Sequence, residues 1–252
     1  MLRVPVDRIE VGDQTLDARA VRHVARVLRV RRGERVMLFD PERTQQAVAE
    51  VLEVDKRGVL CRVDTIETSR LAPLPATTLI QAIGKGDKFD AIVRDATELG
   101  ATHIVAAETA RCIVHLGEKS AARAERWRRV AREAARQSGR DDAPRIDGPY
   151  DWAEALRTVT DVGALRICLW ENAVDPLGPL LAQCGNGPVV VAVGPEGGFD
   201  SAEVDMARDA GFAFASLGPI ILRTETVAAA ILGATLVQRQ VAQAAQRGPR
   251  TP

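Results

Sequence analysis

Two loops of this 252-residue chain contain residue types that suit ligand binding. The first is Gly194–Phe199, with the sequence GPEGGF, which follows the strongly apolar run Val189–Val193. Its glycines allow the backbone to approach a ligand closely and to present amide N–H groups to it. It lacks the Lys-Ser/Thr pair of a P-loop and the GxGxxG of a dinucleotide-binding turn. The central carboxylate, Glu196, disfavours phosphate and suits a ligand with hydroxyl groups or positive charge, although a strained strand-to-helix turn is the alternative.

The second loop, Leu217–Thr226, reads LGPIILRTET and is rich in bulky aliphatic residues. Three such residues after Gly-Pro are unusual in an exposed loop. Beside the first loop, they would form a slot for a flat heterocycle such as adenine. Thr224 or Thr226 can also cap the following helix, with Glu225 in its positive first turn, and that role is compatible with a site.

Strands and helices alternate from Thr77 onward. The apolar patterns predict strands at residues 79–83, 104–107, 165–170, 189–193 and 212–217, and helices at about 87–100, 120–138, 200–211 and 225–243. Asp200 and Glu203 have the spacing of a capping box. This alternation predicts an α/β fold with a parallel sheet covered on both faces. Ligands bind such sheets beyond the carboxyl ends of the strands, which is where both loops lie.

The N-terminal part of the chain has a different pattern. Short β-prone runs at Val36–Phe39, Gln46–Val54 and Val59–Val63 predict a small barrel or sandwich, and the apolar spacing within Ala18–Leu28 predicts one helix. The uncharged, proline-containing segment Leu71–Ala76 is typical of a linker. We therefore expect a small β domain at residues 1–70, a linker at 71–77, an α/β domain at 78–245 and a tail at 246–252.

The charge is balanced overall, with 34 basic and 34 acidic residues, but it is unevenly distributed. Residues 19–35 carry seven arginines and one glutamate, and residues 119–140 carry eight basic and two acidic side chains, so each run has a net charge of +6. Two basic runs in a neutral protein favour a docked polyanion such as nucleic acid, although a solvated helix face is the alternative. On the second run Trp127 lies opposite the arginines and is expected in the core. The candidate RNA-binding residues are Arg26, Arg29, Arg126, Arg129, Arg136 and Arg140.

Several classes of protein are disfavoured. The chain has no uncharged apolar stretch of membrane-spanning length, and charges near the N-terminus argue against a signal peptide. We therefore expect a cytoplasmic protein without a membrane partner. The four cysteines are far apart and form no Cys/His cluster, which predicts reduced, packed thiols and no metal site.

Five motifs in register carry a family resemblance: Lys85–Asp90, Ala96–Gly100, Gln137–Arg140, Gly194–Phe199 and Leu217–Thr226. Together they resemble the RsmE family, the bacterial 16S rRNA uridine-N3 methyltransferases of the SPOUT class. His23–Arg29 and Leu38–Asp40 resemble that family's PUA-like barrel. The resemblance implies a SPOUT domain with a trefoil knot, S-adenosylmethionine as methyl donor, 16S rRNA of the small ribosomal subunit as substrate, and a homodimer.

The resemblance also implies site residues. The cofactor-binding residues would be Leu169, Gly194, Glu196, Gly197, Gly198, Leu217, Gly218 and Leu222. The chain departs from the family pattern at Val227, where Ala is usual, at Trp170-Glu171-Asn172, where His-Glu-Glu is common, and at Cys112, where Ser is common.

Methyl transfer to uracil N3 needs positioning and a deprotonated base more than it needs a covalent nucleophile. The candidate catalytic residues are Arg223 and Arg111, which would stabilise the uracil anion, and Glu171, which would act as base. For Arg223 the alternative is a salt bridge to Glu225 or Glu196, and His115 is a weaker candidate base. Rival functions are a SPOUT enzyme acting on a ribose 2′-hydroxyl or another base, and a non-catalytic ribosome assembly factor. A nucleotide hydrolase is disfavoured because no Walker pair is present.

Overall fold

The structure is a computed structural model that describes residues 1–16, 30–41, 43–55, 58–68, 75–112, 117–140, 142–160 and 162–247. The chain divides into two compact units. The first comprises Met1–Pro73 together with Arg132–Ala143, and the second comprises Leu74–Ala131 together with Pro144–Pro252. The linker expected at residues 71–77 stays a prediction, and the inclusion of residues 132–143 in the first unit was not expected.

The first unit contains a six-stranded sheet of order β1-β3-β4-β5-β2, with β6 paired to β4. Its strands are β1 (Leu2–Pro5), β2 (Gly12–Leu16), β3 (Arg35–Asp40), β4 (Gln45–Val54), β5 (Val59–Val63) and β6 (Glu67–Thr68). Among the strands that the structure describes in this unit, β1 and β3 pair in parallel and the other pairs are antiparallel. Alternate residues such as Leu38, Val51 and Cys61 fill one apolar core. The three strands predicted from sequence correspond to β3, β4 and β5, whereas the helix predicted at residues 18–28 lies outside the described residues.

The second unit contains a wholly parallel sheet of order β12-β10-β11-β7-β8-β9. Its strands are β7 (Thr77–Ala82), β8 (His103–Glu108), β9 (Arg145–Asp151), β10 (Leu165–Leu169), β11 (Val189–Val193) and β12 (Ala213–Ala215). Its helices are α2 (Lys88–Glu98), α4 (Trp152–Arg157), α5 (Leu177–Leu181), α6 (Ser201–Asp209), α7 (Thr224–Arg247) and the first part of α3 (Ser120–Ser138), which follows a 3₁₀ turn η2 (Gly117–Lys119). The end of α3, from Arg132, belongs to the first unit.

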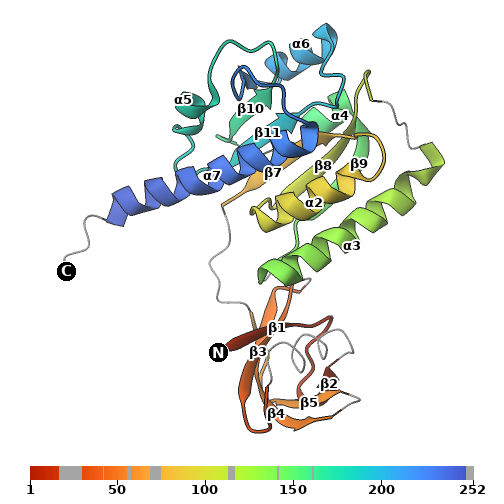
Figure 1. The fold of residues 1–252 in the computed structure, drawn as a ribbon, viewed down its shortest axis with the longest axis vertical. Helices are drawn as coiled ribbons and strands as arrows, with labels where there is room; N and C mark the ends of the chain where they lie inside the picture. The colour runs from red at the N-terminus through yellow and green to blue at the C-terminus, as the bar shows by residue number, and fades with distance from the viewer. Residues whose placement is uncertain are drawn as a thin grey trace. The chain divides into compact units, whose positions relative to one another are not determined.

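Helices cover both faces of this sheet, as predicted (Figure 1). Every residue of β11 is buried, with Val189, Val191 and Val193 on one face and Val190 and Ala192 on the other. The first face packs against α2, α3, α5 and α7, and the second against α4 and α6. Burial on both faces explains the unbroken apolar run of this strand.

Several local predictions are confirmed. The helix at residues 120–138 has the expected bounds, and Asp200 with Glu203 forms a complete capping box at the start of α6. Trp127 is a core residue with 1% of its surface exposed, and the four cysteines are free and buried. Burial raises the pKa of the Cys61 thiol to about 11, which keeps it protonated.

A buried arginine connects α7 with the amino ends of the strands. The Arg239 guanidinium donates to the carbonyl oxygens of Pro75, Ala76 and Gly187, at 2.9 to 3.2 Å. It also donates to the hydroxyl of Thr77, the first residue of β7.

In the described part of the chain, no helix is long and apolar enough to cross a membrane.

Candidate active site

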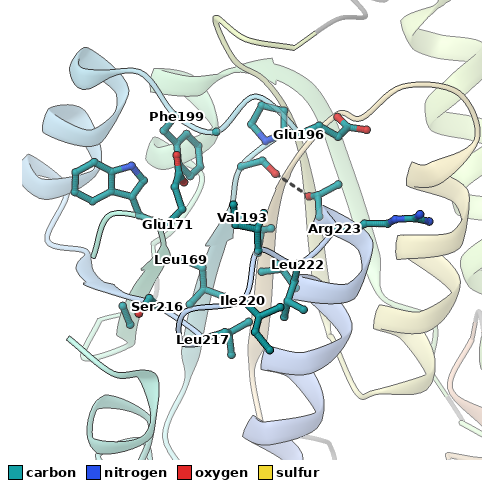
Figure 2. Close-up of a pocket in the computed structure, with 18 of the residues that line it drawn as sticks. Leu169, Glu171, Val193, Glu196, Phe199, Ser216, Leu217, Ile220, Leu222 and Arg223 are labelled. Atoms are coloured by element: carbon teal, nitrogen blue, oxygen red, sulfur yellow. Dashed lines mark hydrogen bonds between the residues drawn. The ribbon is translucent and has the colours of Figure 1, made fainter. Parts of the chain in front are cut away.

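The two loops predicted to bind a ligand meet in one cavity of about 530 Å³, at the carboxyl ends of β10, β11 and β12. This volume lies in the range typical of small-molecule sites. Figure 2 shows residues from the end of β10 facing residues of both loops. The lining includes Leu169, Trp170 and Glu171 after β10, Gly194–Phe199 after β11, and Leu217–Thr224 after β12.

One side of the cavity is apolar. Leu169, Leu217, Ile220 and Leu222 lie together there, as Figure 2 shows. In the loop itself, Ile220 is 74% exposed and Ile221 is 91% exposed. In the described part of the chain, the N–H groups of Leu217–Gly218 and Ile220–Leu222 make no hydrogen bond. An apolar slot with free backbone donors suits a flat heterocycle that carries ring nitrogens.

The Gly-rich loop is packed so closely that side chains would not fit. A Cβ atom on Gly194 would lie 3.1 Å from the ring of Phe199, and one on Gly197 would lie 3.1 Å from Cβ of Arg111. Gly198 adopts φ +69°, and its Cβ would lie 2.5 Å from Oε1 of Glu171. The glycines therefore bring the loop into contact with the segments after β8 and β10.

A buried hydrogen-bond chain joins the two loops. The Thr224 hydroxyl donates to the carbonyl oxygen of Gly194 at 2.7 Å, and accepts from Nε2 of Gln81 at 2.9 Å. Gln81 is the penultimate residue of β7 and is fully buried. The expectation that Thr224 caps the last helix therefore needs correction, because its hydroxyl is taken up by the other loop.

Glu196 faces a cation of the protein itself. Its Oε1 accepts from Nζ of Lys88 at 2.7 Å and from the backbone N–H of Lys85 at 3.4 Å. Burial alone would raise the pKa of Glu196, but the hydrogen bonds from Lys88 and from the backbone outweigh it and hold that pKa below its usual value. Figure 2 shows its carboxylate on the side away from Leu169 and Leu217.

Two of the candidate catalytic residues, Arg111 and Glu171, contact the Gly-rich loop, and the third, Arg223, belongs to the aliphatic loop that lines the cavity. Arg111 donates from its guanidinium to the carbonyl oxygen of Gly197 at 2.9 Å. The carboxylate of Glu171 lies against Gly198. Arg223 is exposed and, among the described residues, makes no ion pair or side-chain hydrogen bond. The alternative interpretation, a salt bridge from Arg223 to Glu225 or Glu196, is therefore not observed. Lys88 pairs with both carboxylates instead.

Three residues that support the site were not predicted as part of it. Lys88 lies inside one of the family-like motifs, but only the fold brings it to Glu196. Gln81 belongs to an apolar strand that gives no sign of a polar role. Glu203 was identified as a cap, yet its Oε1 also accepts from the N–H of Ala110 at 2.6 Å and so secures the segment that carries Arg111.

The arginines predicted to bind RNA differ in availability. Arg126 pairs with Asp90 and Asp87, Arg136 with Asp7, and Arg140 with Asp142. The side chains of Arg136 and Arg140 are only 15% and 8% exposed. Arg129 is exposed and has no partner among the described residues, whereas Arg26 and Arg29, like His115, lie outside them.

Comparisons with known proteins agree with this architecture. Family models described as an RNA methyltransferase domain and an RNA methyltransferase PUA domain match residues 71–236 and 16–64. Ribosomal RNA small subunit methyltransferase E of Mycobacterium bovis is 34% identical over 218 residues, 84% of this chain and 81% of that protein. The enzyme of the same name from Bacillus subtilis is 31% identical over 88% of each chain.

Solved structures give the same result. The crystal structure of a ribosomal RNA small subunit methyltransferase E from Neisseria gonorrhoeae, bound to S-adenosyl methionine, superposes with a TM-score of 0.75 and 32% identity. The match covers 94% of this chain and 97% of that one. The parallel α/β domain with its cavity is thus that of an RNA methyltransferase, with a PUA domain at the N-terminus. The chain belongs to the ribosomal RNA small subunit methyltransferase E family, which confirms the resemblance and its SPOUT-class fold. The trefoil knot stays a prediction.

Proposed function

We propose that this protein transfers a methyl group from S-adenosylmethionine to N3 of a uridine in 16S rRNA. The observation that carries the proposal is the cavity between the Gly-rich loop and the aliphatic loop, at the carboxyl ends of the parallel strands. Its support is the SAM-bound structure of the Neisseria gonorrhoeae enzyme, which is 32% identical over 94% of this chain. The rRNA substrate follows from the name shared by the relatives.

The residues around the cavity fit the cofactor. When bound, S-adenosylmethionine supplies an electrophilic methyl group on a sulfonium. The apolar slot suits its adenine, and the unpaired N–H groups of the aliphatic loop can recognise the ring nitrogens. The Gly-rich loop lines the cavity beside this slot, and its glycines let it pack closely against Phe199, Arg111 and Glu171, which fixes its backbone next to the rest of the cofactor. The proposed contacts are Leu169, Gly194, Gly197, Gly198, Leu217, Gly218 and Leu222, with Glu196 at the cavity rim.

The chain's own residues must favour the deprotonated uracil. A neutral N3 carries a proton and is a poor nucleophile, so the site needs positive charge or a base beside it. Arg223 is exposed at the cavity and has no acidic partner among the described residues, which leaves its guanidinium available to the uracil anion. Glu171, also at the cavity, is the candidate base. Arg111 is the second candidate cation, although its bond to Gly197 already serves the loop.

The partners follow from the same assignments. We propose that the protein acts in the cytoplasm on the small ribosomal subunit, with the N-terminal unit and the exposed Arg129 contributing to RNA binding.

We also propose a homodimer formed through the second unit. Its support is the exposed apolar stripe Leu236, Val237 and Val241 on α7, since such stripes mark interfaces. Light scattering should give twice the chain mass, and Val237→Asp with Val241→Asp should halve it.

Nucleoside analysis tests the proposed reaction. Small subunits from cells that lack this protein are incubated with the purified protein and methyl-labelled S-adenosylmethionine, and the 16S rRNA is digested to nucleosides. We expect label in 3-methyluridine. Label in a 2′-O-methylated nucleoside or in another base would replace the proposed target, and binding of subunits without any label would indicate an assembly factor.

A further inference from the structure

We propose that Lys88 is a positioning residue that holds the Gly-rich loop in its cofactor-binding conformation through Glu196. The inference rests on the proposed function, because it assigns a role in S-adenosylmethionine binding to a residue that does not line the cavity. Lys88 opens α2, whereas the loop follows β11, so the two are joined only by the fold.

The contact is direct and is made from a fixed point. Nζ of Lys88 lies 2.7 Å from Oε1 of Glu196 and 3.8 Å from Oε2 of Glu225, the second residue of α7. The next residue, Phe89, is buried against Trp127 with ring centroids 4.3 Å apart. Helix α2 therefore presents the ammonium from a well-packed position.

The backbone just before α2 also contacts the carboxylate of Glu196. It accepts from the N–H of Lys85, and a Cβ atom on Gly84 would lie 3.2 Å from its Oε1. Because Gly84 has no side chain, the carboxylate can settle onto the backbone before α2. Three features therefore meet at one loop carboxylate: a lysine, a backbone donor and a glycine.

Charge gives this contact a second consequence. The pKa of Lys88 is raised, chiefly by its hydrogen bond to Glu196, and the positive charge of Arg223 opposes this rise. Arg223 is therefore near the same carboxylates, and without Lys88 it would be the cation available to Glu196 and Glu225. By pairing with both carboxylates, Lys88 leaves Arg223 without an acidic partner among the described residues. The same lysine thus orders one loop and keeps the candidate catalytic cation of the other available.

Calorimetric titration of the full chain with S-adenosylmethionine tests the proposal. We expect Lys88→Met to raise Kd about three- to tenfold, the range that a partly exposed ion pair supports. Lys88→Arg should recover most of the affinity, and the melting temperature should stay near that of the wild type. Arg94→Met is the matched control, because it removes a cation of the same helix whose partner is the adjacent Asp95.

A double-mutant cycle shows whether Lys88 acts through Glu196. If it does, Lys88→Met combined with Glu196→Gln should be no worse than the stronger single variant. Additive losses, or an unchanged Kd in folded Lys88→Met, would overturn the proposal. If Lys88→Met does not fold, Glu196→Gln provides the test, because an unchanged Kd in that variant would show that the Lys88–Glu196 pair does not support cofactor binding and would overturn the proposal. Failure of the wild type itself to bind S-adenosylmethionine would instead count against the proposed function.

Discussion

The carboxylate of Glu171 occupies the space that a side chain on Gly198 would need: Oε1 would lie 2.5 Å from the missing Cβ. The two residues belong to different crossovers, one after β10 and the other after β11. Both residues line the cavity, and they meet just before the Gly-rich loop leads into α6. A substitution at Gly198 therefore acts on the loop and on the candidate base together.

Gly198→Val should abolish S-adenosylmethionine binding in a protein that remains folded. Valine is strained at φ +69° and its side chain collides with Glu171. Gly194→Val should have a similar effect by displacing Phe199. Isothermal titration provides the measurement, with Gly178→Ala as control because a Cβ there meets no atom within 4 Å. Wild-type affinity in a folded Gly198→Val protein would rule out this loop as the cofactor site.

Arg223→Ala should reduce turnover far more than cofactor affinity. If the guanidinium stabilises the uracil anion, the loss should be about 10²-fold or more, as for removal of one oxyanion donor. Higher pH should partly restore activity because more uracil is then deprotonated. Arg223→Lys should recover only part, since a point charge does not reproduce a planar fork. Steady-state rates at saturating S-adenosylmethionine between neutral and alkaline pH test this, and equal losses of kcat and affinity with no pH response would assign Arg223 a structural role.

Arg129→Glu should weaken rRNA binding and reduce its salt dependence without affecting cofactor affinity. Each phosphate contact contributes about 0.9 to the slope of log K against log salt on duplex sites, and less on single strands. Arg129 is the clean test because Arg126 and Arg136 already pair with acidic residues. Filter binding over a salt series gives the slope, and Arg208→Glu on α6 serves as the control. An unchanged slope would place the RNA-binding surface elsewhere.

Glu203→Ala should destabilise the second unit. The side chain caps α6 at the Asp200 N–H and accepts from the Ala110 N–H, and its residue is 4% exposed. Loss of a cap together with a buried acceptor typically costs about 1–3 kcal/mol. Denaturant unfolding measures the loss. Asp205→Ala is the control, since among the described residues its carboxylate pairs only with Arg208, on the helix surface. A loss no larger than in that control would mean that neither the cap nor the Ala110 contact contributes to stability.

The strands and helices that were predicted share strong local signals. β11 has the bounds expected from its apolar run, and α6 begins at the expected cap. In the second unit β9, α4 and α5 were missed: β9 is interrupted by Gly-Pro, α4 spans six residues and α5 spans five with an internal Gly-Pro. In the first unit β1, β2 and β6 were missed. Helices as short as α4 and α5 form because the sheet offers them an apolar surface, and sequence periodicity does not report that surface.

The two loops that line the cavity could be identified from the sequence, but the contacts between them could not. Gly and aliphatic runs at the ends of strands identify Gly194–Phe199 and Leu217–Thr226, because chemistry in parallel sheets gathers at that edge. The Lys88–Glu196 and Gln81–Thr224 pairs span 108 and 143 residues of sequence. Such pairings depend on the order in which strands enter the sheet, which local patterns do not encode.

The buried Arg239 has a consequence for the order of events during protein synthesis. Its guanidinium donates hydrogen bonds to the carbonyl oxygens of Pro75, Ala76 and Gly187. These three residues are translated well before Arg239. Until residue 239 has left the ribosome, those carbonyls at the start of β7 and before β11 lack their final partner. The Gly-rich loop likewise lacks its hydrogen bond at the Gly194 carbonyl until Thr224 has been made. The methyltransferase unit therefore completes its fold only when nearly all of its chain has been translated, so a nascent chain stalled before this point should remain sensitive to protease.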